Sequence, residues 1–213
     1  MAQLSNLKIQ HTGQNVDVLI RELNRKLVDI RNVVNLNAIN RWDDLRFPVA
    51  GINPVGPGAA PGADSVNGGL LFSPILTEVI AFQAQMPHAW LEGSAIRPHV
   101  HWQKTTSAAG DVLWRFEYKH APIGEVMDAA FTALDSTTLA DGTPDNDTTE
   151  EHLITTFSDI DMTGNTISHM LLCKLSRIGG DGSDTYGADA RLMEIDIHFE
   201  TDYPGGSPSL FTK

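Results

Sequence analysis

The chain has one cysteine, Cys173, among its 213 residues, and it is also poor in basic residues, with 15 Lys and Arg against 27 Asp and Glu. A single cysteine excludes an intrachain disulfide framework and a cysteine-based zinc site. The resulting net charge of −12 argues against binding to phosphates, because duplex DNA and anionic membranes attract a basic face. We therefore expect neither a nucleic-acid partner nor a membrane partner.

Long apolar runs and enzyme motifs are missing as well. No stretch approaches the roughly 20 apolar residues that cross a bilayer, and residues 1–13 lack the pattern of a secretory signal. No serine lies in a G-x-S-x-G elbow, and no glycine-rich phosphate loop precedes a helix. We expect a protein that folds in a reducing cytosol, is not an enzyme and needs no cofactor.

A helical pattern dominates residues 1–40, where apolar residues recur at alternating spacings of four and three. This is the period of a coiled-coil seam, and its mixture of β-branched and leucine positions leaves dimer and trimer open. Packing of a single helix on its own domain is the alternative interpretation. The predicted oligomerisation residues are Val16, Ile20, Leu23, Leu27, Ile30 and Val34.

Residues 41–69 contain a long stretch of glycine, proline and alanine that runs from Pro48 to Gly69. Proline donates no backbone hydrogen bond and glycine offers no side chain to bury, so regular structure is not expected there. The pattern predicts an extended arm between the helix and the next domain. Trp42, Leu45 and Phe47 are expected to pin this arm to a surface, such as that of a neighbouring subunit.

Residues 70–213 show period-2 alternation, which is typical of strands with one buried and one wet face. The clearest runs cover 80–86, 96–103, 112–119 and 193–200, and weaker ones lie near 70–73, 130–139, 151–160 and 166–176. Turn signals separate them, for example Ala109-Gly110-Asp111. The fold class is mainly β: an antiparallel β-sandwich of the jelly-roll type, preceded by the N-terminal α-helix and the Gly/Pro-rich arm.

Three histidines are the low-ranking candidates for a metal site. His99 and His101 lie two residues apart on one predicted strand, so they share a face as metal ligands do in cupin jelly rolls, and His198 is the candidate third ligand. However, Val100 and Trp102 take the buried face, which leaves the histidines on the polar one. A wet sheet face with cross-strand charge pairs is therefore the favoured interpretation, and no metal is expected.

Two loops are rich in carboxylates, at 141–151 and 181–189, and calcium favours such oxygen-rich loops. Neither matches the twelve-residue EF-hand spacing, and Gly/Asp turns adopt similar sequences without an ion. Among the aromatic residues, Trp42, Phe47 and Trp90 are the candidates for docking a partner, which would be a protein or a glycan.

Three segments carry a resemblance to a known family: Trp42–Pro54 (WDDLRFPVAGINP), Met86–Lys104 (MPHAWLEGSAIRPHVHWQK) and Ser176–Tyr203 (SRIGGDGSDTYGADARLMEIDIHFETDY). They resemble structural virion proteins of tailed bacteriophages that have no assigned role. The resemblance implies a jelly-roll virion component, trimeric, attached to the capsid, neck or tail, and it supplies no catalytic residues.

These observations lead to one expected function and two alternatives. We expect a homotrimeric capsid decoration protein, either a cement or a head-fibre part, assembled in the host cytoplasm and located on the virion. The first alternative is a neck or tail accessory protein that contacts host glycans. The second, of another class, is a cupin-like metal-dependent enzyme that uses the three histidines.

Overall fold

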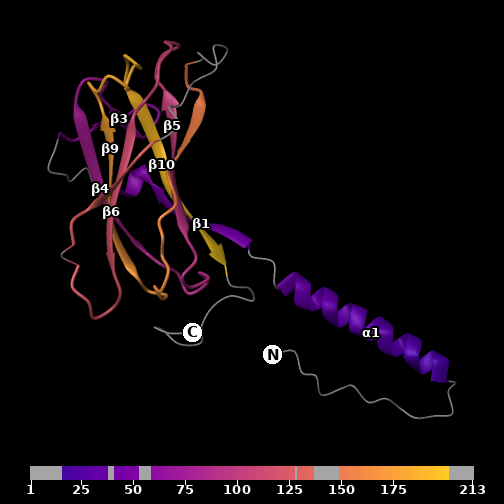
Figure 1. The fold of residues 1–213 in the computed structure, drawn as a ribbon. Coiled ribbons are helices and arrows are strands. Elements are labelled where there is room, and N and C mark those ends of the chain that lie inside the picture. Colours follow the sequence, from indigo (N-terminus) through magenta and orange to yellow (C-terminus); the bar gives the residue numbers. More distant parts are fainter. Residues whose placement is uncertain (1–15, 38–40, 53–58, 128, 137–148, 202–213) are drawn as a thin grey trace. The chain divides into compact units, whose positions relative to one another are not determined.

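The computed structural model describes residues 16–37, 41–52, 59–127, 129–136 and 149–201 (Figure 1). The chain divides into two units, Met1–Ile39 and Asn40–Lys213. The first unit contains helix α1 (Val16–Asn37), and the second contains the strands.

Helix α1 carries an unburied apolar surface. Six of its apolar side chains lie in the described part, and each keeps between 42% and 53% of its surface exposed. They are Val18, Ile20, Leu23, Leu27, Val28 and Ile30. The side chains of Val16 and Val34, at the two ends of the predicted seam, lie outside the described part. Within the described residues, no helix has both the length and the apolar character that crossing a membrane requires.

The described part of the second unit forms ten strands and one 3-10 turn. They are β1 (Arg41–Pro48), η2 (Val49–Gly51), β2 (Gly62–Ala63), β3 (Leu70–Phe72), β4 (Thr77–Gln85), β5 (Ile96–Lys104), β6 (Trp114–Ala121), β7 (Thr132–Asp135), β8 (His152–Thr156), β9 (Met170–Ile178) and β10 (Ala190–Thr201). The predicted mainly β class and the two-sheet antiparallel sandwich are therefore confirmed.

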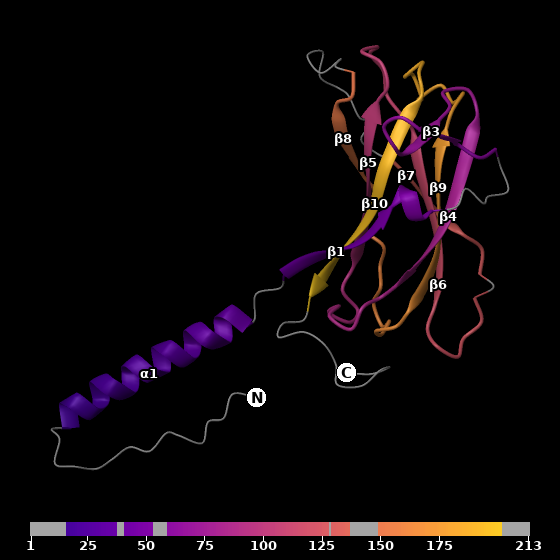
Figure 2. The same cartoon turned by 180° about the vertical axis from the view of Figure 1, so that it is seen from behind.

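The strands form two sheets that Figures 1 and 2 show from opposite sides. The larger sheet has the order β2-β3-β10-β5-β8, with β1 also paired to β10, and the smaller has the order β4-β9-β6-β7. The pairing is nested: β3 pairs with β10, β4 with β9, β5 with β8 and β6 with β7, all antiparallel. From β3 onward, every connection except β6–β7 passes from one sheet to the other.

The core between the sheets is filled by aromatic and aliphatic side chains. Trp102 on β5 and Trp114 on β6 are fully buried, with ring centroids 6.2 Å apart, and Phe72 meets Trp114 edge-on at 5.1 Å. The indole nitrogen of Trp102 donates to Thr155 Oγ1 on β8 at 3.0 Å, so its polar atom is satisfied inside the core. Because each strand alternates, the residues between these core positions point to the outer faces.

Two expectations about the arm need correction. Residues 41–48 are not a separate arm, because they form β1 and pair with β10 from Arg41↔Thr201 to Pro48↔Glu194. Leu45 and Phe47 pack against the core of their own sandwich, and Phe47 lies 4.9 Å from the ring of Phe82. Burial of these two side chains and a complete ladder with β10 favour the strand over a free arm.

The alternation predicted for β10 also breaks at one point. The register with β5 shifts between Leu192 and Glu194, an irregularity of the kind that a β-bulge produces. As a result Leu192 is fully buried and Met193 is only half-buried, although strict alternation along 193–200 places Met193 on the same face as Ile195 and Ile197. An extra residue in one strand interrupts the alternation, so the residues before it and the residues after it do not follow one continuous period of two.

Candidate functional site

The predicted metal candidates lie on the outer face of the larger sheet. On β5, Val100 and Trp102 belong to the core, so His99 and His101 point outward. On β10, Ile195 and Ile197 belong to the core, so the side chains of residues 196 and 198 point outward in the same way. This placement differs from a cupin site, which lies inside the barrel.

Three donor atoms converge on this face. His99 Nε2 lies 3.0 Å from His101 Nε2, and Asp196 Oδ2 lies 3.4 Å from the first nitrogen and 3.2 Å from the second. These atoms belong to directly paired strands, since His99 is the cross-strand partner of Asp196. We call His99, His101 and Asp196 the histidine cluster, and it is the group within the described residues that meets the geometry of a metal site.

Neighbouring side chains hold the histidine cluster in place. His101 Nδ1 lies 2.7 Å from His152 Nε2 on β8. The ring of His198 meets that of His99 edge to face, with the ring centroids 4.3 Å apart. The Nε2 atom of His198 lies 3.0 Å from Asp44 Oδ1 on β1. Residues from four adjacent strands thus meet around one point of the sheet.

Burial makes charge costly in the histidine cluster. The side chains of His99 and Asp196 are each 93% buried. Desolvation, aided by the nearby His198 and His101, lowers the pKa of His99 to about 4, while desolvation and then Glu194 raise the pKa of Asp196. At neutral pH His99 is therefore uncharged, and its contact with Asp196 is not an ion pair.

The third member of the cluster is not the residue that the pattern indicated. Asp196 faces both imidazole nitrogens, whereas the predicted third ligand, His198, faces Asp44. The alternation of β10 places Asp196 and His198 on the same face, so it limits the candidates for the third ligand to residues of that face. Only the register of β10 against β5 decides which of them lies opposite His99.

A second histidine pair lies on the smaller sheet and was not singled out from the sequence. His120 Nδ1 lies 2.7 Å from His169 Nε2, and His169 is almost fully buried. Within the described residues, His169 Nδ1 has no hydrogen-bond partner. Desolvation, with a smaller contribution from His120, lowers the pKa of His169 to about 4.

We expect this pair to destabilise the sandwich in acid. An unfolded histidine binds its proton near pH 6.5, but His169 in the fold binds one only near pH 4. Between these values the unfolded state holds more protons, so stability falls as the pH drops, by up to about 1.4 kcal/mol per pH unit from this group. Urea unfolding at pH 7, 6 and 5 should show a shallower acid loss in His169→Gln than in the wild type. An unchanged slope in the variant would contradict the assignment.

The two carboxylate-rich loops are only partly described. Both carboxylate oxygens of Asp184 bind Arg177, at 2.7 Å and 2.9 Å, and Asp181 Oδ1 accepts from the backbone of Ser183. Asp184 is thus engaged by a guanidinium, which does not favour calcium in the loop at 181–189. In the loop at 141–151, residues 141–148 lie outside the described part, and Glu150 pairs with Arg191.

The predicted docking aromatics have three different environments. Trp42 on β1 is exposed, with its ring 6.4 Å from that of His198. Phe47 is half-buried against the core, and Trp90 is fully buried. The prediction that Trp90 docks a partner is wrong in this fold. Trp90 forms an antiparallel bridge with Thr201, and its side chain belongs to the core. Trp42 remains the candidate for contact with a partner.

No protein-family model matches this chain, and no significant match is found among the curated proteins.

Proposed function

We propose that this protein is a structural component of a tailed-bacteriophage virion, without catalytic activity, that assembles as a homotrimer and decorates the capsid as a cement or head-fibre part. The resemblance of residues 42–54, 86–104 and 176–203 to such proteins supports the class. In this proposal the partners are further copies of the chain and other virion proteins, and assembly takes place in the host cytoplasm.

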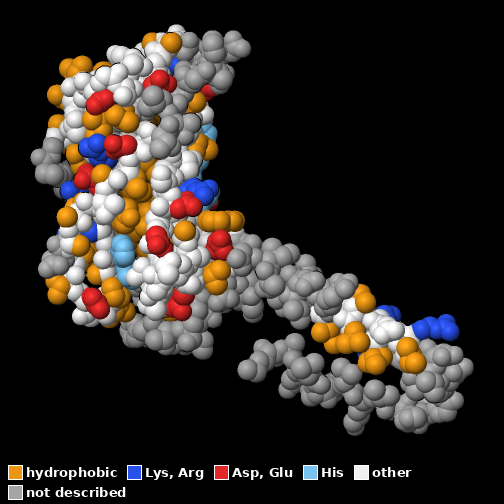
Figure 3. All heavy atoms as spheres, in the orientation of Figure 1, with side chains coloured by type: hydrophobic (Ala, Val, Ile, Leu, Met, Phe, Trp, Pro, Cys, Tyr) orange, Lys and Arg blue, Asp and Glu red, His pale blue; other side chains and the backbone are white. Residues whose placement is uncertain are grey.

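The observation that carries the proposal is the exposed apolar surface of α1. Figure 3 shows hydrophobic side chains gathered along the described part of the helix. Ile20, Leu23, Leu27 and Ile30 follow the coiled-coil spacing and are all exposed. Complete burial of an aliphatic side chain of this size contributes about 1.5–3 kcal/mol, and these side chains are about half exposed, so two or three copies of the helix gain by burying the remainder.

The nested pairing of the strands supports the finer description of the fold. A chain that pairs as one long hairpin, from β3–β10 to β6–β7, and is then rolled into two sheets is the arrangement of a jelly roll. We infer this fold for residues 70–201, with β1 and β2 added at the β10 and β3 side of the larger sheet.

The charge of the chain supports exposure on the outside of a particle. At a net charge of −12, packaged DNA repels the protein rather than attracting it. An acidic chain that combines a β-sandwich domain with a helix suited to association fits a decoration role. The neck or tail alternative uses the same features, and the exposed indole of Trp42 is the residue that favours glycan contact in that case.

Disruption of the helical seam tests the proposal. Light scattering of the purified chain should give a mass near three times 23.2 kDa, and Leu23→Asp combined with Leu27→Asp should give a monomer, because two charges per copy would have to be desolvated in the seam. The matched control is Ile75→Asp combined with Ile123→Asp. Both residues are apolar, lie on the sandwich and are more exposed than Leu23 and Leu27, so this double variant should leave the mass unchanged.

The result has clear alternatives. A double Leu variant that keeps the wild-type mass would place the interface in the sandwich, and a monomeric wild type would contradict the trimer. Labelled protein added to phage particles should then bind the capsid. Binding to the tail, or to glycans through a contact that Trp42→Ala abolishes, would favour the accessory role instead.

A further inference from the structure

We propose that His99, His101 and Asp196 form a binding site for a divalent first-row transition-metal ion, with zinc as the test ion, on the outer face of the larger sheet. The inference is independent of the virion assignment, because it rests on the geometry of three side chains. The ion would join β5 to β10 with two imidazole nitrogens and one carboxylate oxygen.

The spacing of the donor atoms matches that of ligands around one ion. Ligands at about 2.0–2.1 Å from a metal lie about 3.4 Å apart in a tetrahedron and about 2.9 Å apart on one face of an octahedron. The three separations in the histidine cluster, 3.0, 3.2 and 3.4 Å, fall within this interval. Two histidines and one carboxylate are a donor set that such ions use, and they leave further positions for water.

Hydrogen bonding alone does not satisfy these three contacts when Asp196 is ionised and both rings are neutral. Each Nε2 either carries a proton and only donates, or lacks one and only accepts. If both nitrogens carry protons, two donors face each other at 3.0 Å, and if only one does, a bare nitrogen faces the carboxylate. A metal ion among the three atoms removes this conflict because all of them then act as electron-pair donors. A proton on Asp196, whose pKa burial raises, is the competing solution, and zinc has to displace it.

The surroundings provide the support that metal ligands ordinarily have. A ligating histidine generally donates its other ring N–H to a neighbouring acceptor, which orients the ring. His101 Nδ1 lies 2.7 Å from His152 Nε2, so the tautomer of His101 with its proton on Nδ1 donates to His152 and leaves Nε2 free for the ion. In addition, Asp196 Oδ1 is buried and has no hydrogen-bond partner among the described residues, which leaves it available for a second bond to the ion or for a metal-bound water.

The test is zinc binding by the full-length chain without a polyhistidine tag. After treatment with EDTA, isothermal titration with ZnCl₂ at pH 7.5 should show one site per chain and a dissociation constant below about 10 µM. Co²⁺ in place of zinc should give visible absorption bands whose intensity reports the coordination geometry. Zinc should also raise the melting temperature in a concentration-dependent way, because the ion binds the folded state.

Variants identify the ligands. His101→Gln and Asp196→Asn should each weaken zinc binding at least tenfold, and His152→Gln should weaken it about tenfold through the orientation of His101. His88→Gln is the matched control and should retain affinity within about threefold. His198→Gln removes a ring that packs on His99 and should weaken binding less than Asp196→Asn does, an order that separates this ligand set from the one that includes His198.

Each further outcome decides the proposal. Loss of binding in His198→Gln together with full binding in Asp196→Asn would overturn the ligand assignment. A wild-type dissociation constant above about 1 mM, or equal binding by the wild type and His101→Gln, would overturn the site. His101 is partly exposed, so His101→Gln remains a valid test if Asp196→Asn does not fold, with circular dichroism in EDTA as the check.

Discussion

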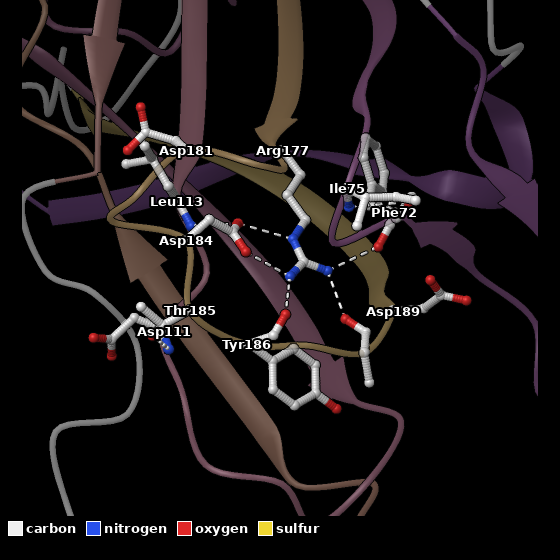
Figure 4. A network of polar contacts seen from close by, with 12 residues as sticks. Phe72, Ile75, Asp111, Leu113, Arg177, Asp181, Asp184, Thr185, Tyr186 and Asp189 are labelled. Carbon is white, nitrogen blue, oxygen red and sulfur yellow. Dashed lines mark hydrogen bonds and ion pairs between the residues drawn. The ribbon is translucent and has the colours of Figure 1, made fainter.

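Replacement of Arg177 by leucine should lower the free energy of unfolding of the sandwich by about 3–5 kcal/mol. Figure 4 shows the guanidinium at the end of β9, surrounded by acceptors. It makes a two-pronged contact with Asp184 and also donates to the carbonyl oxygens of Phe72, Ala188 and Tyr186. Both charged side chains are fully buried, so the leucine variant would leave the Asp184 carboxylate inside the protein without its counter-charge.

Urea unfolding of the wild type and the variant at pH 7 measures this effect. The control is Arg115→Leu, because Arg115 makes a similar two-pronged contact with Asp135 at a partly exposed position, and the change should cost about 0–1 kcal/mol. Arg177→Leu combined with Asp184→Leu should recover part of the loss, since no unpaired charge then remains. If Arg177→Leu and Arg115→Leu cost the same, burial of the pair is not what makes it important.

Gly110→Ala should destabilise the sandwich by about 3 kcal/mol or more. Gly110 has φ +134°, and a Cβ there would lie 2.6 Å from the carbonyl oxygen of Thr185 and 2.7 Å from Tyr186 Cα. The obstacle is backbone, which cannot turn aside as a flexible side chain would. The two amides of residues 185 and 186 both donate to the carbonyl of Asp111, so any shift also strains these hydrogen bonds.

Two other glycines separate the clash from the backbone preference. Gly124 has φ +89° but no heavy atom near its Cβ position, so Gly124→Ala should cost about 1–2 kcal/mol. Gly182 has neither constraint, and Gly182→Ala should change stability by less than about 0.5 kcal/mol. Thermal unfolding of the three variants should preserve this order, and an equal loss at Gly110 and Gly124 would rule out the contact with residues 185 and 186.

The two large effects should not add. Arg177 binds the carbonyl of Tyr186, and the Cβ of an alanine at 110 would press on the same residue. Arg177 and the close approach at Gly110 therefore both involve one connection, the one between β9 and β10. We expect the double variant Arg177→Leu with Gly110→Ala to lose less stability than the two single losses together, because the first change already loosens what the second disturbs.

Local patterns were sufficient for the sandwich and for much of its core. Alternation along β4, β5 and β6 predicted the inward positions of Phe82, Trp102 and Trp114. The turn signal at Ala109-Gly110-Asp111 lies in the connection between β5 and β6. These features are encoded over a few residues, because successive side chains of a strand point to opposite faces whatever strand lies beside it.

Long-range features were not accessible in the same way. Residues 41–48 could not be recognised as β1, because their partner lies about 150 positions later in β10. The burial of Trp90 likewise depends on a bridge to Thr201. No local pattern marked Arg177, whose acceptors come from residues 72, 184, 186 and 188.

The sequence by itself determined the acidic charge, the apolar spacing of residues 16–34 and the alternating faces of the strands, including the outward direction of His99 and His101. The tertiary structure alone decided that Asp196 completes the histidine cluster and that His198 turns to Asp44. The physical reason is that the direction of a side chain follows from its own strand. Its neighbours, in contrast, follow from the pairing and register of strands distant in the chain, which the packing of the whole core selects.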